Sequence, residues 1–321
     1  MISALLVAAS LSSSCSTSRS YEKQTASALD SLPSTTLSSV DFAFATMVNA
    51  GVDNDFAKKI ETQFLKEKEN AEIRDKIVSL NVLGFLSPGD YSKHYSLSAV
   101  KHIKGFLKKY RTVLSRAEKD FQVPRETVAS LLWVETKHGK TMGNFSLPVV
   151  YFSLLQANHP MVAKNTLLEL NRRRPASNSS SVNLSNEELQ QKVIQRSINK
   201  SKWALEQIKI LEQLSNKQAL NQPGRSSSRS MLSIRSSFAG AFGCSQFIPS
   251  SYEKYAVSFS KKKTPNLFDM KDCIFSVANF LHKSGWDSQN PKAQSDALFE
   301  YNRIRDYGDV IQKLATAAHQ A

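Results

Sequence analysis

The chain has 321 residues, of which 41% are hydrophobic, so it can bury a sizeable core in one large domain or two smaller ones. Lysine and arginine total 42 against 28 aspartate and glutamate, and the net charge of +14 indicates an anionic partner such as nucleic acid, an acidic membrane surface or an acidic polymer. The basic runs are scattered and lack the regular aromatic interleaving of a base-stacking surface, which argues against a nucleic-acid-binding protein.

The first residues are typical of an export signal. An apolar run over residues 2–11 is too short to span a bilayer as a helix, and three serines and Cys15 follow it. This pattern resembles a bacterial lipoprotein signal, in which Cys15 becomes the lipidated first residue and anchors the chain to the outer membrane. However, no basic residue precedes the run, and Leu11 lies one position further from the cysteine than usual. We expect a signal over 1–15 and a Ser/Thr-rich flexible tether over 16–37, and leave lipidation open.

The rest of the chain is predicted to be mainly α-helical. Amphipathic helical patterns cover residues 38–90, 100–121 and 203–214. Segments rich in serine at 175–181 and 222–228 read as loops, and no convincing strand or internal repeat is present.

Glu135 is the strongest catalytic candidate. It lies near the end of a predicted helix, and Val128, Leu131 and Leu132 precede it by seven, four and three residues, which places its carboxylate on the core-facing stripe. Desolvation and the negative end of the helix dipole should both raise its pKa. A carboxyl that stays protonated near neutral pH suits a general acid.

A structural interpretation of Glu135 is also open. Its side chain could bend out to water or pair with Lys137 or Lys140 at the helix end, where Gly139 is expected to stop the helix. Glu126 falls on the opposite face and reads as a solvated acid of the first turn.

A second segment, residues 237–252, combines small residues, aromatic residues and one glutamine. Gly240 and Gly243 would let the backbone approach a ligand closely, Phe242 and Phe247 would offer flat apolar faces, and Gln246 a two-ended hydrogen-bonding group. Proteins bind sugars with such groups. The alternative is a glycine-bearing turn between two helices, with its aromatic side chains in the core.

Taken together, ordered motifs along the chain resemble the membrane-bound lytic transglycosylase B family, which has a lysozyme-like fold. The matching motifs are Val134-Glu135-Thr136 with Gly139, Ser237-Phe238-Ala239-Gly240-Ala241, Gly243, Gln246-Phe247, Pro249-Ser250-Ser251-Tyr252, Tyr255-Ala256-Val257, Asn266-Leu267, Ser276-Val277-Ala278-Asn279, Gly285-Trp286, Tyr301-Asn302 and Tyr307. The resemblance covers roughly residues 38–315. It implies an N-terminal helical region over 38–120 and a catalytic domain over 121–315 with an insertion near 165–230.

The resemblance also implies a function. These enzymes cleave the β-1,4 bond between N-acetylmuramic acid and N-acetylglucosamine in peptidoglycan strands, without water or a cofactor, and close a 1,6-anhydro ring. Glu135 would be the single acid and base. The residues expected to line the glycan cleft are Ser237, Gln246, Phe247, Tyr301, Asn302 and Tyr307. A muramidase that hydrolyses the same bond and a non-catalytic peptidoglycan-binding protein remain alternatives.

The chain departs from the family pattern at several positions. His138 and Phe280 stand where tyrosine is usual, and Cys244 is also unusual at its position. The family often carries a calcium loop where this chain has residues 258–269. There Lys262 and Lys263 replace a carboxylate and a turn glycine, so we predict no metal and expect Asp269 to cap a helix that ends near Lys283.

Two cysteines remain beyond Cys15. Cys244 and Cys273 could form a disulfide in an oxidising compartment or remain two small buried thiols, and the sequence leaves both possibilities open.

Overall fold

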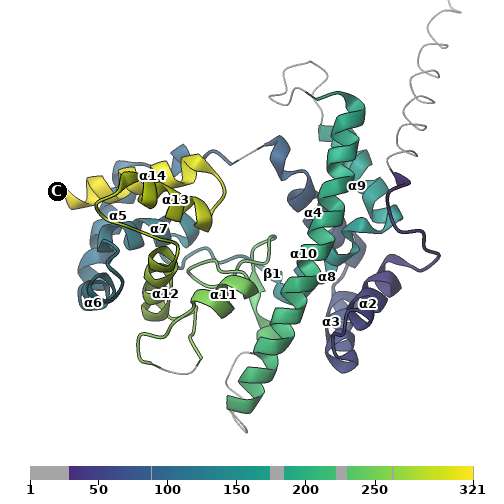
Figure 1. Ribbon diagram of the computed structural model, residues 1–321, viewed down its shortest axis with the longest axis horizontal. Coiled ribbons are helices and arrows are strands. Elements are labelled where there is room, and N and C mark those ends of the chain that lie inside the picture. Colours follow the sequence, from purple (N-terminus) through teal and green to yellow (C-terminus); the bar gives the residue numbers. More distant parts are fainter. Residues whose placement is uncertain (1–28, 88, 174–183, 222–229, 262–263, 321) are drawn as a thin grey trace, which may run out of the picture. The chain divides into compact units, whose positions relative to one another are not determined.

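The computed structural model describes residues 29–87, 89–173, 184–221, 230–261 and 264–320 (Figure 1). The predicted signal with Cys15 and the two predicted serine-rich loops lie outside these residues. The described chain is mainly helical, which confirms the predicted class. Its only strands, β1 (Phe145–Ser146) and β2 (Arg235–Ser236), pair antiparallel. No helix within the described ranges is long and apolar enough to cross a bilayer.

The chain divides into two compact units. The first comprises residues 1–87 and 151–206, and the second comprises 88–150 and 207–321. In the second unit, the helix at 97–109 packs against the helix that carries Glu135.

The first unit is helical. Its elements are α2 (Ser39–Asn49), α3 (Asn54–Lys66), α4 (Asn70–Val82), η1 (Gly84–Leu86), the end of α8 (Leu147–Leu155), η3 (Gln156–Asn158), α9 (Pro160–Arg173) and the first part of α10 (Asn186–Asn221). The rings of Phe64 and Phe152 pack in its core with centroids 5.1 Å apart. Ser38 and Asp53 cap α2 and α3 by accepting hydrogen bonds from backbone N–H groups.

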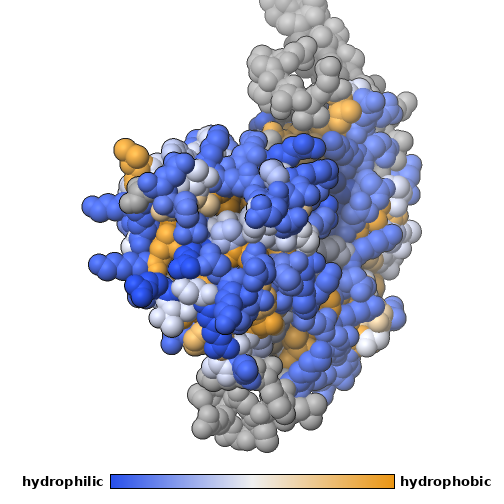
Figure 2. Space-filling model, turned by 60° about the vertical axis from the view of Figure 1, so that its left-hand side comes forward, coloured by the Kyte–Doolittle hydropathy of each residue, from blue (hydrophilic) through white to orange (hydrophobic). Residues whose placement is uncertain are grey.

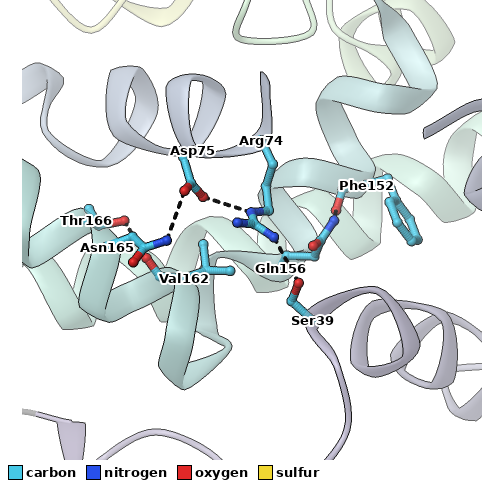
Figure 3. Close-up of polar contacts among 8 residues, drawn as sticks. All are labelled: Ser39, Arg74, Asp75, Phe152, Gln156, Val162, Asn165 and Thr166. Atoms are coloured by element: carbon cyan, nitrogen blue, oxygen red, sulfur yellow. Dashed lines mark hydrogen bonds and ion pairs between the residues drawn. The ribbon is translucent and has the colours of Figure 1, made fainter. Parts of the chain in front are cut away.

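A polar network joins three helices of this unit (Figure 3). The Asp75 carboxylate accepts a hydrogen bond of 2.8 Å from Nε of Arg74 and one of 2.9 Å from Nδ2 of Asn165. Nη1 of Arg74, whose residue is only 5% exposed, donates to Oγ of Ser39 at 3.0 Å. The buried guanidinium thus has both an acid and a hydroxyl partner, as a buried charge requires.

α10 corrects one sequence-based expectation. Helix was predicted over 203–214, whereas α10 begins at Asn186 and ends at Asn221. Its first half reads as polar, yet Gln190, Ser197 and Ser201 are buried among Val193 and Ile194. Small and amide side chains fill helix-packing positions there, so the apolar pattern that marks a core-facing helix is weak. The described residues of the predicted insertion are therefore largely helical.

The second unit contains the candidate site. Its elements are η2 (Tyr91–His94), α5 (Leu97–Lys109), α6 (Arg111–Phe121), α7 (Arg125–Thr136), the start of α8, the end of α10, η4 (Met231–Ser233), α11 (Pro249–Tyr255), α12 (Met270–Lys283), α13 (Pro291–Tyr301) and α14 (Arg305–His319). α7 packs against α5, α12 and α14 (Figure 1). The single helix predicted over 100–121 breaks at Tyr110, which ends α5 and precedes α6.

α12 agrees with its prediction. Asp269 is its N-cap and accepts a hydrogen bond from the backbone N–H of Lys271 at 2.9 Å. The predicted inward positions Ile274, Val277, Ala278 and Leu281 are all fully buried.

The visible surface in Figure 2 is mostly hydrophilic, with small separate hydrophobic areas. Leu97 is the most exposed large apolar residue described, at 85%. Single exposed apolar side chains of this kind are normal for a protein surface.

Candidate active site

An ion pair fixes the start of α7. The Arg125 guanidinium pairs with Oε2 of Glu118 on α6, and the Arg125 backbone N–H donates to Oε1 of the same carboxylate at 3.1 Å. Nη1 of Arg125 also donates to Oγ of Ser115 at 3.0 Å. The first turn of α7, the helix that carries Glu135, is therefore held to α6 at two points by charge-assisted hydrogen bonds.

The end of α7 has an unusual backbone. Lys137, His138 and Gly139 all have positive φ, at 51°, 56° and 87°. Helix therefore stops at Thr136, three residues before the glycine that was expected to stop it. The Thr136 hydroxyl donates to the carbonyl of Cys244 at 3.0 Å, which links the helix end to the segment at 237–247.

Glu135 is partly exposed and largely desolvated. Burial raises the pKa of its carboxyl to about 7, while a hydrogen bond from Tyr307 acts in the opposite direction. The Tyr307 hydroxyl donates to Oε1 of Glu135 at 2.6 Å. The carboxyl thus has the raised pKa that the sequence predicted, and its partner is a phenol rather than Lys137 or Lys140.

Tyrosines surround this carboxyl. Tyr307 is fully buried; its ring lies parallel to that of Tyr301, with centroids 6.2 Å apart, and edge-on to that of Tyr91 at 5.4 Å. Burial raises the pKa of Tyr301 and Tyr307, so both phenols stay protonated and can donate. Tyr301 donates to the carbonyl of Ser245 at 2.5 Å.

Tyr91 is a site residue that the sequence reading missed. Nδ2 of Asn302 donates to its hydroxyl at 2.9 Å, and its ring packs on Tyr307. It lies in the short helix η2, more than two hundred residues from Asn302 in sequence. No local pattern marked it, because its role depends on this long-range contact.

The 237–247 segment folds as a tight turn. Oγ of Ser237 accepts from the backbone N–H groups of Ala239 and Ala241, and Nε2 of Gln246 donates to the carbonyl of Gly243 at 2.9 Å. A Cβ on Gly243, which has a φ of 71°, would lie 2.4 Å from the carbonyl oxygen of Leu267. Glycine at position 243 therefore allows the backbone of Leu267 to approach closely, and not a ligand.

Phe247 and Phe242 are core residues. They are only 2% and 1% exposed, as the alternative interpretation of this segment expected. Phe247 packs on Phe280 at 5.8 Å and on Tyr301 at 5.9 Å. Of the predicted site residues, Glu135, Tyr301, Asn302 and Tyr307 form one connected cluster with Tyr91, Phe247 supports it from the core, and Ser237 and Gln246 bond within their own turn.

His138 and Phe280, which stand where tyrosine is usual in the family, have structural roles. The His138 ring stacks on Phe106 with centroids 3.9 Å apart, and its Nε2 lies 2.9 Å from the carbonyl of Ala129. Burial lowers the pKa of His138 to about 4, so the ring is neutral near pH 7. Phe280 packs against Tyr301 at 4.6 Å and contributes no hydroxyl there.

Asp272 organises the loop at 258–269 by accepting hydrogen bonds from it. Asp272 is 5% exposed; its Oδ1 accepts from Oγ of Ser258 and N–H of Phe259, and its Oδ2 accepts from N–H of Asn266. Within the described ranges, no group of three or more histidine, cysteine or acidic residues is placed to hold a metal ion. The described residues of this loop therefore do not fit a calcium ion, although Lys262 and Lys263 lie outside the description.

Cys244 and Cys273 form a disulfide, with their Cα atoms 6.0 Å apart. This resolves the question that the sequence left open. The bond joins the turn beside Thr136 to the first part of α12.

With this geometry established, the family can be assigned. A family model described as Transglycosylase SLT domain matches residues 60–307, and the chain belongs to this family. The sequence resemblance to lytic transglycosylases is thereby confirmed.

Individual relatives agree with this assignment. Membrane-bound lytic murein transglycosylase B of Escherichia coli (strain K12) is 29% identical over 181 residues, which cover 56% of this chain and 37% of that protein. The match thus spans well under half of that relative's length.

Solved structures show the same fold. The E. coli lytic transglycosylase Slt35 in complex with calcium superposes with a TM-score of 0.58 at 18% identity, covering 88% of this chain and 92% of that chain. SltB3 of Pseudomonas aeruginosa in complex with NAG-NAM-pentapeptide gives a TM-score of 0.57 at 15% identity, covering 88% and 79%. The expected lysozyme-like helical fold is confirmed.

Proposed function

We propose that this protein is a lytic transglycosylase that cleaves the β-1,4 bond between N-acetylmuramic acid and N-acetylglucosamine and forms 1,6-anhydro-N-acetylmuramic acid. The Glu135–Tyr307 pair carries this proposal. A partly exposed carboxyl with a pKa of about 7 can both give and take a proton near neutral pH. In this proposal a single carboxyl serves both steps.

In the first step, protonated Glu135 gives its proton to the glycosidic oxygen of the leaving N-acetylglucosamine as the bond to the muramic acid C1 breaks. The resulting carboxylate is stabilised by the hydrogen bond from Tyr307. In this proposal the substrate's own acetamide stabilises the positive charge at C1, in place of the second carboxylate of a two-acid glycosidase.

In the second step, the Glu135 carboxylate takes the proton of the muramic acid 6-hydroxyl while O6 bonds to C1. The acid is regenerated and no water is consumed. Tyr307, which is neutral and buried, lies beside the carboxyl and helps to keep water from competing for C1.

The remaining predicted residues bind the glycan in this proposal. Gln246, Ser237, Tyr301 and Asn302 are partly exposed and offer amide and hydroxyl groups to sugar substituents. Phe247 and Tyr307 are buried and act by holding Tyr301 and Glu135 in place.

We also propose that the chain is exported, acts in the periplasm on peptidoglycan strands, and is anchored through Cys15 where that cysteine is lipidated. The support is the N-terminal sequence pattern and the similarity to the membrane-bound E. coli transglycosylase.

The test is Glu135→Gln, assayed for solubilisation of purified peptidoglycan. We expect near-complete loss of cleavage with an unchanged circular dichroism spectrum. Glu126→Gln is the matched control, since Glu126 lies on the same helix and its Oε1 lies 3.7 Å from Nδ1 of His319. Retained cleavage by Glu135→Gln would mean that another group is the acid.

A further inference from the structure

Lys137 places a positive charge near the catalytic candidate. Its Nζ lies 2.8 Å from Nδ1 of His94 and 4.8 Å from the ring centroid of Trp133. Within the described part of the chain, no carboxylate forms an ion pair with this ammonium, and its side chain is only partly exposed. A desolvated cation without an anionic partner is unfavourable, and such groups occur mainly where a ligand supplies the charge.

The backbone at Lys137 is also unfavourable for a lysine. This residue has a φ of 51°, in the left-handed region that glycine or asparagine adopts most readily at a helix end. Backbone conformations of this kind gather at functional sites, where the surrounding structure enforces them. A lysine here is thus costly in both conformation and solvation.

His94 accepts a hydrogen bond from the Lys137 ammonium and holds it in place. Burial, and then the charge of Lys137, lower the pKa of the His94 ring, so it is neutral near pH 7. Because the ammonium donates to Nδ1, the ring proton is on Nε2. Nε2–H lies on the ring edge away from Lys137, so His94 positions the ammonium, and the remaining N–H groups of Lys137 can donate to an anion such as a carboxylate.

Direct contacts connect this pair to the catalytic carboxyl. Tyr91 stacks on His94 with ring centroids 5.7 Å apart, and it packs edge-on against Tyr307, which bonds Glu135. Nevertheless, the Lys137 ammonium bonds His94, whereas the described partner of the Glu135 carboxyl is Tyr307. Its charge is thus not used to hold the catalytic acid ionised and is available to a ligand.

We propose that Lys137, held in place by His94, forms an anion subsite that binds a carboxylate of the peptide stem on the glycan substrate. This inference rests on the proposed function and adds a substrate requirement to it: stems with free carboxylates are preferred over neutral ones. The net charge of +14 favours approach of such an acidic polymer but does not position it, whereas the subsite does.

The first experiment compares two substrates that differ only in stem charge: native peptidoglycan and the same material with its carboxylates converted to carboxamides. We expect the wild-type protein to have a higher kcat/KM on native material, and Lys137→Gln to lose about tenfold there and little on the amidated form. Lys140→Gln is the matched control, because Lys140 is an exposed lysine three positions along the chain. Lys137→Arg should retain much of the preference, since it keeps the charge.

Equal losses on both substrates, or no wild-type preference between them, would overturn the subsite. A binding measurement keeps the inference separate from catalysis. Calorimetric titration of the disaccharide pentapeptide into Glu135→Gln and into Glu135→Gln with Lys137→Gln should show about tenfold weaker binding for the second protein. Equal affinities of the two proteins would overturn the subsite even if neither the native nor the amidated peptidoglycan is cleaved. Weaker binding by the double variant, with no cleavage by the wild-type protein, would support the subsite and refute the enzyme proposal.

Discussion

The Tyr307 hydroxyl donates a hydrogen bond of 2.6 Å to Oε1 of Glu135, and this bond connects α14 to the end of α7. Burial raises the pKa of the carboxyl and the phenol lowers it again, with a result of about 7. The protonation state of Glu135 near neutral pH is therefore set by two opposing effects of its surroundings, each of which can be changed separately.

The pH dependence of cleavage follows from this value. Glu135 must be protonated to act on the glycosidic oxygen, so kcat/KM should fall as pH rises through about 7. Initial rates of peptidoglycan solubilisation between pH 5 and about 9 would measure this limb. A profile that stays flat to the alkaline end would contradict the assignment of Glu135 as the acid.

Removing the Tyr307 hydroxyl should shift the alkaline limb of the pH–rate profile. Tyr307→Phe deletes the bond that favours the ionised carboxylate, so the pKa of Glu135 should rise and the alkaline limb should shift to higher pH. The maximal rate should fall roughly tenfold or more, since the carboxylate intermediate loses its donor. Tyr301→Phe is the control, because the Tyr301 hydroxyl donates to the Ser245 carbonyl and not to Glu135. A limb that moves equally in both variants would indicate a general structural effect.

The same pKa makes stability depend on pH. The carboxyl pKa is raised from 4.5 to about 7 on folding, so folding favours the protonated form. Its contribution to stability is present below about 4.5 and is lost as pH rises through 7. We expect Glu135→Gln, which stays neutral, to gain unfolding free energy relative to wild type as pH increases over this window. Denaturant unfolding at several pH values would measure it, and a constant difference would contradict the raised pKa.

The disulfide and Asp272 should stabilise the catalytic unit without calcium. Reduction of the Cys244–Cys273 bond should lower the free energy of unfolding by about 3 kcal/mol, because the unfolded chain regains freedom. A metal chelator should leave the unfolding temperature unchanged. Differential scanning calorimetry with and without reductant and chelator tests both statements, and a large chelator effect would show a metal site that the described residues do not reveal.

Local sequence patterns predicted the features that depend on short-range interactions along the chain, such as the buried face of a helix and its N-cap. The apolar spacing before Glu135 placed it on a core-facing stripe, and Asp269 caps α12 where its sequence position suggested. Motif order also identified Tyr301, Asn302 and Tyr307, which the fold brings together around Glu135.

Other features depend on contacts that no local pattern encodes. Tyr91 joins the site through Asn302, far away in sequence, and Phe247 is buried because Phe280 and Tyr301 cover it. The left-handed conformation of Lys137 is set by the link from Thr136 to Cys244 and the turn that follows, and not by a glycine at that position.

The most direct test of the central claim is mass spectrometry of the fragments that the protein releases from purified peptidoglycan. We expect muropeptides one water lighter than hydrolysis products, absent in Glu135→Gln, as an intramolecular attack by the 6-hydroxyl requires. Fragments of full hydrolytic mass with a reducing end would make the protein a muramidase, and no release at all would make it a binding protein; either result would contradict the proposed reaction.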